Sequence, residues 1–393
     1  MGAAEPWTLA WCIGCDGKMR LAILGCVVAL LGSACASQAP TARSPKPPEA
    51  SGLRVTAAGH MTTPRAAHSS TRLANGRVLI AGGCTDDGCN LGSPAGATAE
   101  IFDPATGKFR STGSMLLSRD DHRAVLLPDG RVLVAGGWTA HGVTSSTELY
   151  DPRTAHFTPG PDMRSPRAGF AAVVLNDALV LLVGGETEAH VQTATAEIFD
   201  PRMNTFTFTG SMSAARMALA ATVLEDGEVL VAGGIFGRTV LAAAELFDPR
   251  TGRFSAGGSM AVARYKAAAV TLADGRALVI GGAADVEGEQ PYASTELFDP
   301  RSGSFTRGPT MSSGRYKLID STVRLGNGDV VVAGGAPRPE ILSAAKGAFQ
   351  TVEGTLGATR LFLTATALGP RSALLAGGYD RAIRPTAQAW LIG

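Results

Sequence analysis

Charged residues recur at fixed places along the chain, and their types are those that acid–base chemistry uses. An arginine stands 17 residues before a glycine pair in six places and 19 residues before it in a seventh. A glutamate follows each of the first six glycine pairs. The arginines are Arg65, Arg119, Arg167, Arg216, Arg264, Arg315 and Arg360, and the glutamates are Glu100, Glu148, Glu197, Glu245, Glu296 and, in a weaker copy, Glu340. Because a catalytic group is needed once and these groups recur with every unit, we predict buried, hydrogen-bonded ion pairs and assign no catalytic residue. Gln388 replaces the glutamate in the last unit and is expected to pair more weakly.

The residues that directly follow the arginines differ between units, and they are better candidates for binding a ligand. They are His68 in the first unit, Asp120, Asp121 and His122 in the second, Tyr265 and Lys266 in the fifth, and Tyr316, Lys317 and Asp320 in the sixth. If the units close into a ring, the acidic residues of the second unit lie across from the basic and aromatic residues of the fifth and sixth. Such a mouth would hold a zwitterionic or sugar-like ligand by stacking on tyrosine and by hydrogen bonds to the charges. The alternative is that these side chains line a solvated channel or pair with one another locally.

Two histidines raise the question of a metal, because imidazole is a common transition-metal ligand. His68 and His122, with Asp121, would form such a site. The corresponding positions in the other units carry Phe170, Leu219, Ala267, Leu318 and Leu363. Those residues indicate an interior position, where histidines bonded within the core are the simpler interpretation. We therefore assign no metal and no cofactor.

Cys84 and Cys89 share one short loop, CTDDGC. In an oxidising compartment this spacing favours a local disulfide. The alternative is a metal site that uses both thiols with Asp86 and Asp87, but no histidine or second cysteine pair lies nearby in the sequence.

Short apolar runs position all these residues. Residues 129–137, DGRVLVAGG, are the clearest of seven copies that each combine a turn signal, an apolar β-type run and a glycine pair. A second run follows that ends in Asp-Pro, such as TELYDP at 147–152. Asp-Gly or Asn-Gly suits the hairpin between the first two strands of a unit, and Asp-Pro followed by glycine suits the turn between the last two. Four-stranded units of about 45–50 residues predict a β-propeller.

The seventh unit lacks a fourth strand, and the N-terminal part of the domain supplies a substitute. The stretch 52–65 has the same pattern as the fourth strand and exit of the first unit at 107–119. We therefore predict an all-β, seven-bladed propeller over residues 52–393, with antiparallel blades and a last blade closed by the N-terminal strand.

The glycine pair, the Asp-Gly turn, the Glu-x-aromatic-Asp-Pro run and the Met-x-x-x-Arg exit resemble kelch repeats over about residues 52–393. The nearest resemblance is to the propeller of galactose oxidase and related bacterial exported proteins. This implies a fold and says little about function, because kelch propellers serve many purposes. A copper-radical oxidase of that kind would need a Tyr–Cys crosslink, and here the only cysteines of the domain are expected to pair with each other.

The N-terminus predicts export. Residues 18–35 have a basic start, an apolar run and small residues, which is typical of a secretory signal peptide over 1–35; Met19 is the more usual start, which would make 1–18 an over-extension. Cys35 follows Gly-Ser-Ala and resembles the lipidated cysteine of a bacterial lipoprotein; the alternative is ordinary cleavage there and a soluble exported protein. Residues 36–51, rich in Pro, Ala and Ser, would tether the domain to the envelope.

Charge and hydropathy exclude other classes. The chain has 35 Lys and Arg against 34 Asp and Glu, and no basic cluster interleaved with aromatic residues, so nucleic-acid binding is not expected. It has no apolar run of 18 residues, so membrane contact is expected only through a lipid anchor.

The two faces of such a ring differ. The face that carries the first-to-second and third-to-fourth turns (the turn face) repeats nearly the same sequence in most blades. The face that carries the links between blades and the second-to-third loops (the variable face) changes from blade to blade, and function is usually placed on such loops. Candidate partner contacts there are Trp138, His141, His190, Phe236, Tyr292, Tyr379 and Arg381.

We expect a non-catalytic module that binds a protein or glycan. The alternatives are a sugar-processing enzyme resembling kelch-type sialic acid mutarotases, with Arg, Glu or Asp moving protons, and a copper-radical oxidase.

Overall fold

The structure is a computed structural model that describes residues 50–90, 92–189 and 191–393. The predicted signal peptide, Cys35, residues 36–49 of the predicted tether and His190 lie outside the described residues. The described part is all-β apart from one short 3-10 turn, η1 (Pro94–Ala97). It contains no helix that could cross a membrane.

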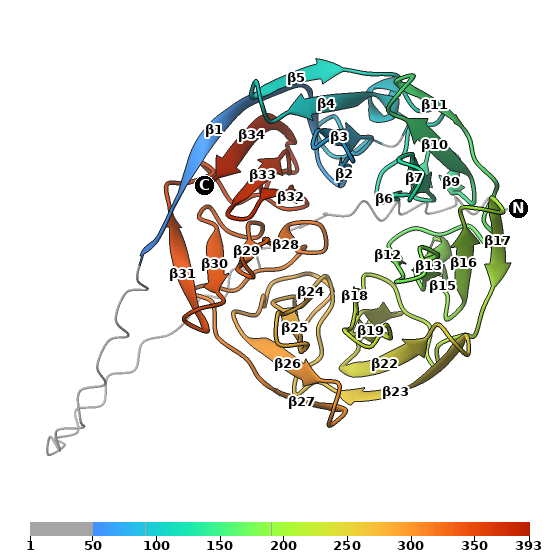
Figure 1. Cartoon of the computed structure of the whole chain (residues 1–393), viewed down its shortest axis with the longest axis vertical. Helices are drawn as coiled ribbons and strands as arrows, with labels where there is room; N and C mark the ends of the chain where they lie inside the picture. Colours follow the sequence, from blue (N-terminus) through green and yellow to red (C-terminus); the bar gives the residue numbers. More distant parts are fainter. Residues whose placement is uncertain (1–49, 91, 190) are drawn as a thin grey trace, which may run out of the picture.

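The strands form four-stranded antiparallel units arranged around a central axis (Figure 1), and the predicted all-β propeller is confirmed. Five units are separate sheets, and two are joined into one eight-stranded sheet by β1, so the described residues contain seven units. From the inner to the outer strand, blade 1 is β2 (Ser69–Arg72), β3 (Val78–Ala81), β4 (Ala99–Asp103) and β5 (Lys108–Ser111); blade 2 is β6 (Arg123–Leu126), β7 (Val132–Ala135), β10 (Thr147–Asp151) and β11 (His156–Pro159); blade 3 is β12 (Ala171–Val174), β13 (Val180–Val183), β16 (Ala196–Asp200) and β17 (Thr205–Phe208). Blade 4 is β18 (Ala220–Val223), β19 (Val229–Ala232), β22 (Ala243–Asp248) and β23 (Arg253–Ser259); blade 5 is β24 (Ala268–Thr271), β25 (Ala277–Ile280), β26 (Thr295–Asp299) and β27 (Ser304–Arg307); blade 6 is β28 (Thr322–Arg324), β29 (Val330–Val332), β30 (Glu340–Ser343) and β31 (Ala348–Glu353); blade 7 is β32 (Thr364–Gly369), β33 (Ser372–Ala376), β34 (Thr386–Ile392) and β1 (Ala50–Arg65).

The core lies between neighbouring blades. The second strand of each blade is a run of apolar residues, and in β7 (VLVA) and β13 (VLLV) every residue is buried. Leu133 of blade 2 packs in one cluster with Phe170, Leu182 and Phe199 of blade 3. A strand with neighbours on both faces cannot alternate apolar with polar residues, which is why these runs are apolar throughout.

The glycine pair after each second strand brings two blades into contact. A Cβ on Gly136 would lie 2.3 Å from the carbonyl oxygen of Arg167 in the next blade. The N–H of Gly137 donates to the same carbonyl at 2.8 Å. The second glycine of every pair makes this bond to the arginine of the following blade, from Gly83 to Arg119 at 2.9 Å through to Gly378 and Arg65 at 2.7 Å. Glycine is required because a side chain would hold the backbones apart.

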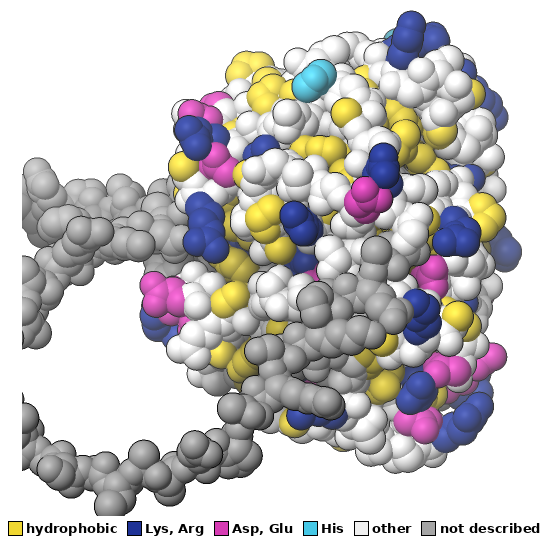
Figure 2. All heavy atoms as spheres, turned by 90° about the vertical axis from the view of Figure 1, so that its left-hand side faces the viewer, with side chains coloured by type: hydrophobic (Ala, Val, Ile, Leu, Met, Phe, Trp, Pro, Cys, Tyr) yellow, Lys and Arg dark blue, Asp and Glu magenta, His cyan; other side chains and the backbone are white. Residues whose placement is uncertain are grey.

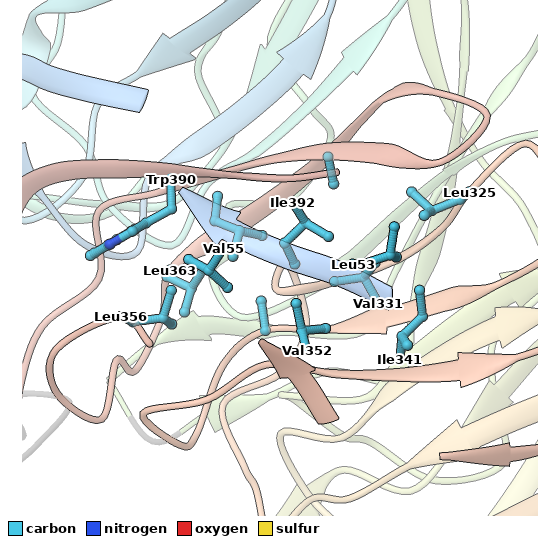
Figure 3. Packing of buried hydrophobic residues seen from close by; sticks show 13 residues of the cluster. Leu53, Val55, Leu325, Val331, Ile341, Val352, Leu356, Leu363, Trp390 and Ile392 are labelled. Carbon is cyan, nitrogen blue, oxygen red and sulfur yellow. The ribbon is translucent and has the colours of Figure 1, made fainter. Parts of the chain in front are cut away.

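Strand β1 closes the ring. It pairs antiparallel with β34, with Val55 opposite Ile392, and its first residues pair in parallel with β31 of blade 6. Leu53 and Val55 are buried with Trp390, Ile392 and Val352, so that β1 fills the space between blades 6 and 7 (Figure 3). The pairing with β34 is the one expected from the sequence. The pairing with β31 was not foreseen.

Candidate functional site

The recurring arginines and glutamates are buried against one another within each blade. In blade 3, Arg167 and Glu197 are fully buried, and Nη2 of Arg167 lies 2.9 Å from Oε1 of Glu197. Arg167 Nη1 also donates to the carbonyls of Gly184 (2.9 Å) and Thr195 (3.0 Å). The carboxylate accepts the backbone N–H of Arg164 at 2.7 Å, in the segment that arrives from blade 2. The corresponding distances are 3.2 Å for Arg65–Glu100, 3.0 Å for Arg119–Glu148, 2.8 Å for Arg216–Glu245, 3.1 Å for Arg264–Glu296 and 2.7 Å for Arg315–Glu340.

The seventh blade differs, as its sequence does. Nη2 of Arg360 lies 3.5 Å from Oε1 of Gln388, and the arginine is half-buried.

Burial lowers the pKa of Arg167, and Glu197 opposes that shift by its charge and hydrogen bond. The six buried pairs thus hold strands and an incoming link together without presenting a charge to solvent.

Seven residues, each two places after an arginine, surround the central axis of the propeller at its variable face. We call these seven residues the left-handed ring. Each has a positive φ: Ala67 (49°), Asp121 (47°), Gly169 (61°), Ala218 (52°), Lys266 (52°), Lys317 (59°) and Phe362 (52°). Backbone N–H groups connect ring members of adjacent blades, as from Asp121 to the Ala67 carbonyl (3.1 Å) and from Lys266 to the Ala218 carbonyl (2.9 Å). A positive φ costs a residue other than glycine on the order of 1–3 kcal/mol, so these inter-blade bonds hold the backbone in place.

His68 and His122 lie beneath this ring and fill contacts between blades. Nε2 of His122 lies 2.9 Å from Oγ of Ser69, and Nε2 of His68 lies 3.1 Å from Oγ1 of Thr364. A Cβ on Gly82 would lie 2.7 Å from Cε1 of His122, so this imidazole packs against the glycine pair of blade 1. Burial lowers the pKa of His68 to about 3 and that of His122 well below its usual value, so both are neutral. No group of three His, Cys, Asp or Glu side chains in the described residues is arranged to hold a metal ion.

At the expected mouth, Arg123, which was not among the predicted site residues, pairs with an acid on each side. Arg123 Nη1 lies 3.0 Å from Oδ2 of Asp320, which joins blade 2 to blade 6, and its Nη2 lies 3.5 Å from Oδ1 of Asp121. Its Nε donates to the carbonyl of Phe170 at 2.7 Å. The sequence does distinguish Arg123, because it begins an inner strand and the inner strands of the other blades begin with Ser, Thr or Ala.

The basic and aromatic side chains of blades 5 and 6 contact one another and blade 7. Lys317 Nζ donates to the Tyr379 hydroxyl at 2.7 Å and lies 5.2 Å from the ring centre of Phe362. Lys266 Nζ lies 5.4 Å from the same ring, a cation–π distance. Tyr265 is buried, and its hydroxyl donates to the carbonyl of Val286 at 2.6 Å. The ring face of Tyr265 is therefore covered in this structure, whereas the half-buried Tyr316 remains a candidate for stacking.

Asp120 is the exception among these charges. It is buried, and its Oδ1 finds no hydrogen-bond partner in the described part of the chain. Burial, and to a smaller extent the charge of Asp121, raise its pKa to about 8. The ligand-binding role of these residues stays a prediction.

A polar cavity of about 190 Å³ occupies the channel beneath the left-handed ring. His122, Arg123, Asp320 and Thr322 line it, together with Ser70. The cavity is smaller than the ~300–1,000 Å³ of most ligand pockets, which are also mainly apolar. Its size and lining suit water or a very small polar molecule.

Cys84 and Cys89 are joined by a disulfide. The loop that they close lies beside blade 7, because the N–H of Gly88 donates to the carbonyl of Ile383 at 3.1 Å. Both cysteines are buried in a cluster with Phe362 and Tyr379.

Three hairpins lie on the variable face, directly after the glycine pairs of blades 2, 3 and 4. They are β8 (Trp138–Thr139) with β9 (Gly142–Val143), β14 (Glu186–Glu188) with β15 (Val191–Gln192), and β20 (Ile235–Phe236) with β21 (Thr239–Val240). Figure 1 shows β9 and β15 beside their blades. Together with residues 283–292 of blade 5, we call these segments the hairpin ridge. Phe236 is 54 % exposed and Val191 46 %. Val191 was not among the partner contacts expected from the sequence; of those besides Phe236, His141 and Arg381 are exposed, Trp138 and Tyr292 are half-buried, and Tyr379 is buried.

The sequence of the second blade matches a known family model. A family model of the kelch motif matches residues 122–164, which contain all four strands of blade 2 and Met163 after them. The chain contains a kelch motif and folds as a kelch-type β-propeller. The other blades of this kelch propeller repeat the same strand order and the same arginine-to-glycine contacts. No curated protein matches the chain.

Proposed function

We propose that this kelch propeller is a non-catalytic binding module that engages a protein partner through the hairpin ridge, in the cell envelope to which its N-terminus would direct it. The observation that carries the proposal is the exposure of Phe236 and Val191 on adjacent hairpins of the variable face. Exposed aromatic and aliphatic side chains grouped on one face are typical of interaction sites, and aromatic residues often dominate the binding energy.

The central channel is a less suitable binding site than the hairpin ridge. Of the charged side chains at the variable end of the channel, Arg123 bonds to Asp320 and Lys317 bonds to the Tyr379 hydroxyl. A ligand there would first have to break those bonds. The ridge needs no such rearrangement, because its exposed side chains already face solvent.

Site-specific photocrosslinking in the native envelope tests the proposal. A photoreactive residue at Phe236 is compared with one at Met203, which is 70 % exposed on the turn face. We expect a discrete protein adduct from position 236 and none from position 203. Equal adducts at both positions, or a glycan adduct at 236, would contradict the proposal.

A further inference from the structure

We infer that the partner of the hairpin ridge presents an apolar side chain flanked by lysines or arginines. The inference rests on the proposed function and adds the chemistry of the bound segment, which the charge distribution of the variable face indicates.

The ridge is one continuous surface. Oε1 of Gln192 in blade 3 accepts the N–H of Gly237 in blade 4 at 3.0 Å. Arg238 of the same hairpin pairs with Glu287 of blade 5. A bound segment that contacts Val191 and Phe236 therefore also meets the charges of these three blades.

Those charges are mainly acidic. The four segments of the ridge contain five carboxylates and one arginine, and that arginine, Arg238, is paired with Glu287. Glu188 lies directly opposite Val191 in its hairpin. In the part of the chain that the structure describes, Glu188 and Glu289 are exposed and take part in no ion pair. The exposed apolar side chains are thus flanked by carboxylates that have no cation of their own.

On the other side of the variable face the loops of blades 6 and 7 are mainly basic, although Asp86 and Asp87 of the blade 1 loop lie beside blade 7. The corresponding loops of blades 6 and 7 carry Arg338, Arg381 and Arg384 against a single acid, Asp380, which is paired with Arg384. Arg338 and Arg381 are exposed. On the side of the ring that Figure 2 shows, by contrast, side chains of both signs are interspersed. The separation of charge on the variable face would orient a basic segment over blades 3 to 5 and repel it from blades 6 and 7.

A second copy of this chain is the competing occupant, because two variable faces could meet with the acidic side of each against the basic side of the other. A two-fold contact would leave the two apolar ridges away from each other, over blades 6 and 7 of the opposite copy. Phe236 and Val191 would then lack an apolar partner surface. A separate partner that brings its own apolar side chain would bury them, and we therefore favour it.

The experiment measures binding of two short labelled peptides to the mature chain by fluorescence anisotropy. Both have a Leu-Phe centre, flanked by lysines in one and by glutamates in the other. We expect the lysine peptide to bind about tenfold more tightly at low salt, and the difference to shrink at about 300 mM NaCl. Glu188→Gln with Glu289→Gln should weaken the lysine peptide about tenfold, whereas the turn-face control Glu225→Gln with Asp226→Asn should leave it unchanged.

Equal binding of the two peptides, binding of neither, or equal effects of the two double variants would overturn the inference. A salt-dependent dimer in sedimentation velocity that the Glu188 and Glu289 changes abolish would also overturn it, in favour of a second copy. If crosslinking at position 236 succeeds while these peptide results fail, the proposed function stands and only the partner chemistry is wrong. If crosslinking at 236 fails, the proposed function itself is wrong.

Discussion

Replacing Arg167 by methionine should destabilise the propeller strongly, and the same change at Arg360 should not. Arg167→Met leaves the Glu197 carboxylate buried with only backbone donors, and leaves the carbonyls of Gly184 and Thr195 without this partner. Removing one member of a buried pair costs about 3–5 kcal/mol. Arg360 is half-buried and faces an uncharged glutamine, so Arg360→Met should cost about 1 kcal/mol or less.

Calorimetry and urea denaturation measure the difference. With an unfolding entropy of about 2.1 cal/mol/K per residue, a unit of this size loses about 1–2 °C of Tm per kcal/mol, so Arg167→Met should lower Tm by about 4–7 °C. Adding Glu197→Gln should recover part of the loss, because the uncompensated carboxylate is removed. Equal losses for Arg167→Met and Arg360→Met, or strictly additive effects of the two blade 3 changes, would refute the assignment of these pairs as buried structural bonds.

Three further perturbations follow from the fold. Leu53→Ala should cost about 2–4 kcal/mol in urea denaturation because Leu53 is 5 % exposed in the closing strand, whereas Leu116→Ala, at a site 59 % exposed, should stay within about 0.5 kcal/mol. Cys84→Ser with Cys89→Ser should cost about 2 kcal/mol, measured as the Tm difference from the oxidised protein, because the disulfide closes only a short loop. Burial raises the pKa of Asp120 to about 8, so the folded carboxyl keeps a proton between about pH 4 and pH 8 that the unfolded chain releases, and stability falls as pH rises through that window. Asp120→Asn should be more stable than the parent at pH 8 and indistinguishable from it near pH 4; a constant difference across pH would show that the charge is not the cause.

The fold was largely readable from the sequence because its determinants are local and repeated. Turn residues, the apolar second strands and the spacing from arginine to glycine pair recur often enough to give strand order and blade limits. The closing strand could be recognised because 52–65 repeats the pattern of 107–119. The second role of β1, its parallel pairing with β31, has no such repeat to compare with.

The candidate site was less predictable because it depends on contacts across the ring. Arg123 and Asp320 are 197 residues apart, and only the closed propeller brings them within 3.0 Å. The left-handed conformation of Lys266, Lys317 and Phe362 does not follow from their residue types, which disfavour it. Burial of Tyr265 could not be read from its sequence neighbours either, because its cover comes from residue Val286 of a variable loop.

The double pairing of β1 has a consequence for biosynthesis. This strand leaves the ribosome before any blade is complete, yet its antiparallel partner β34 is made more than 300 residues later. Until then Leu53 and Val55 have no apolar neighbours from blade 7, and the growing chain carries β1 as an unpaired strand. Blade 7 cannot be completed before β34 has been synthesised, so the slowest step in folding of the propeller should be the pairing of β1 with β34.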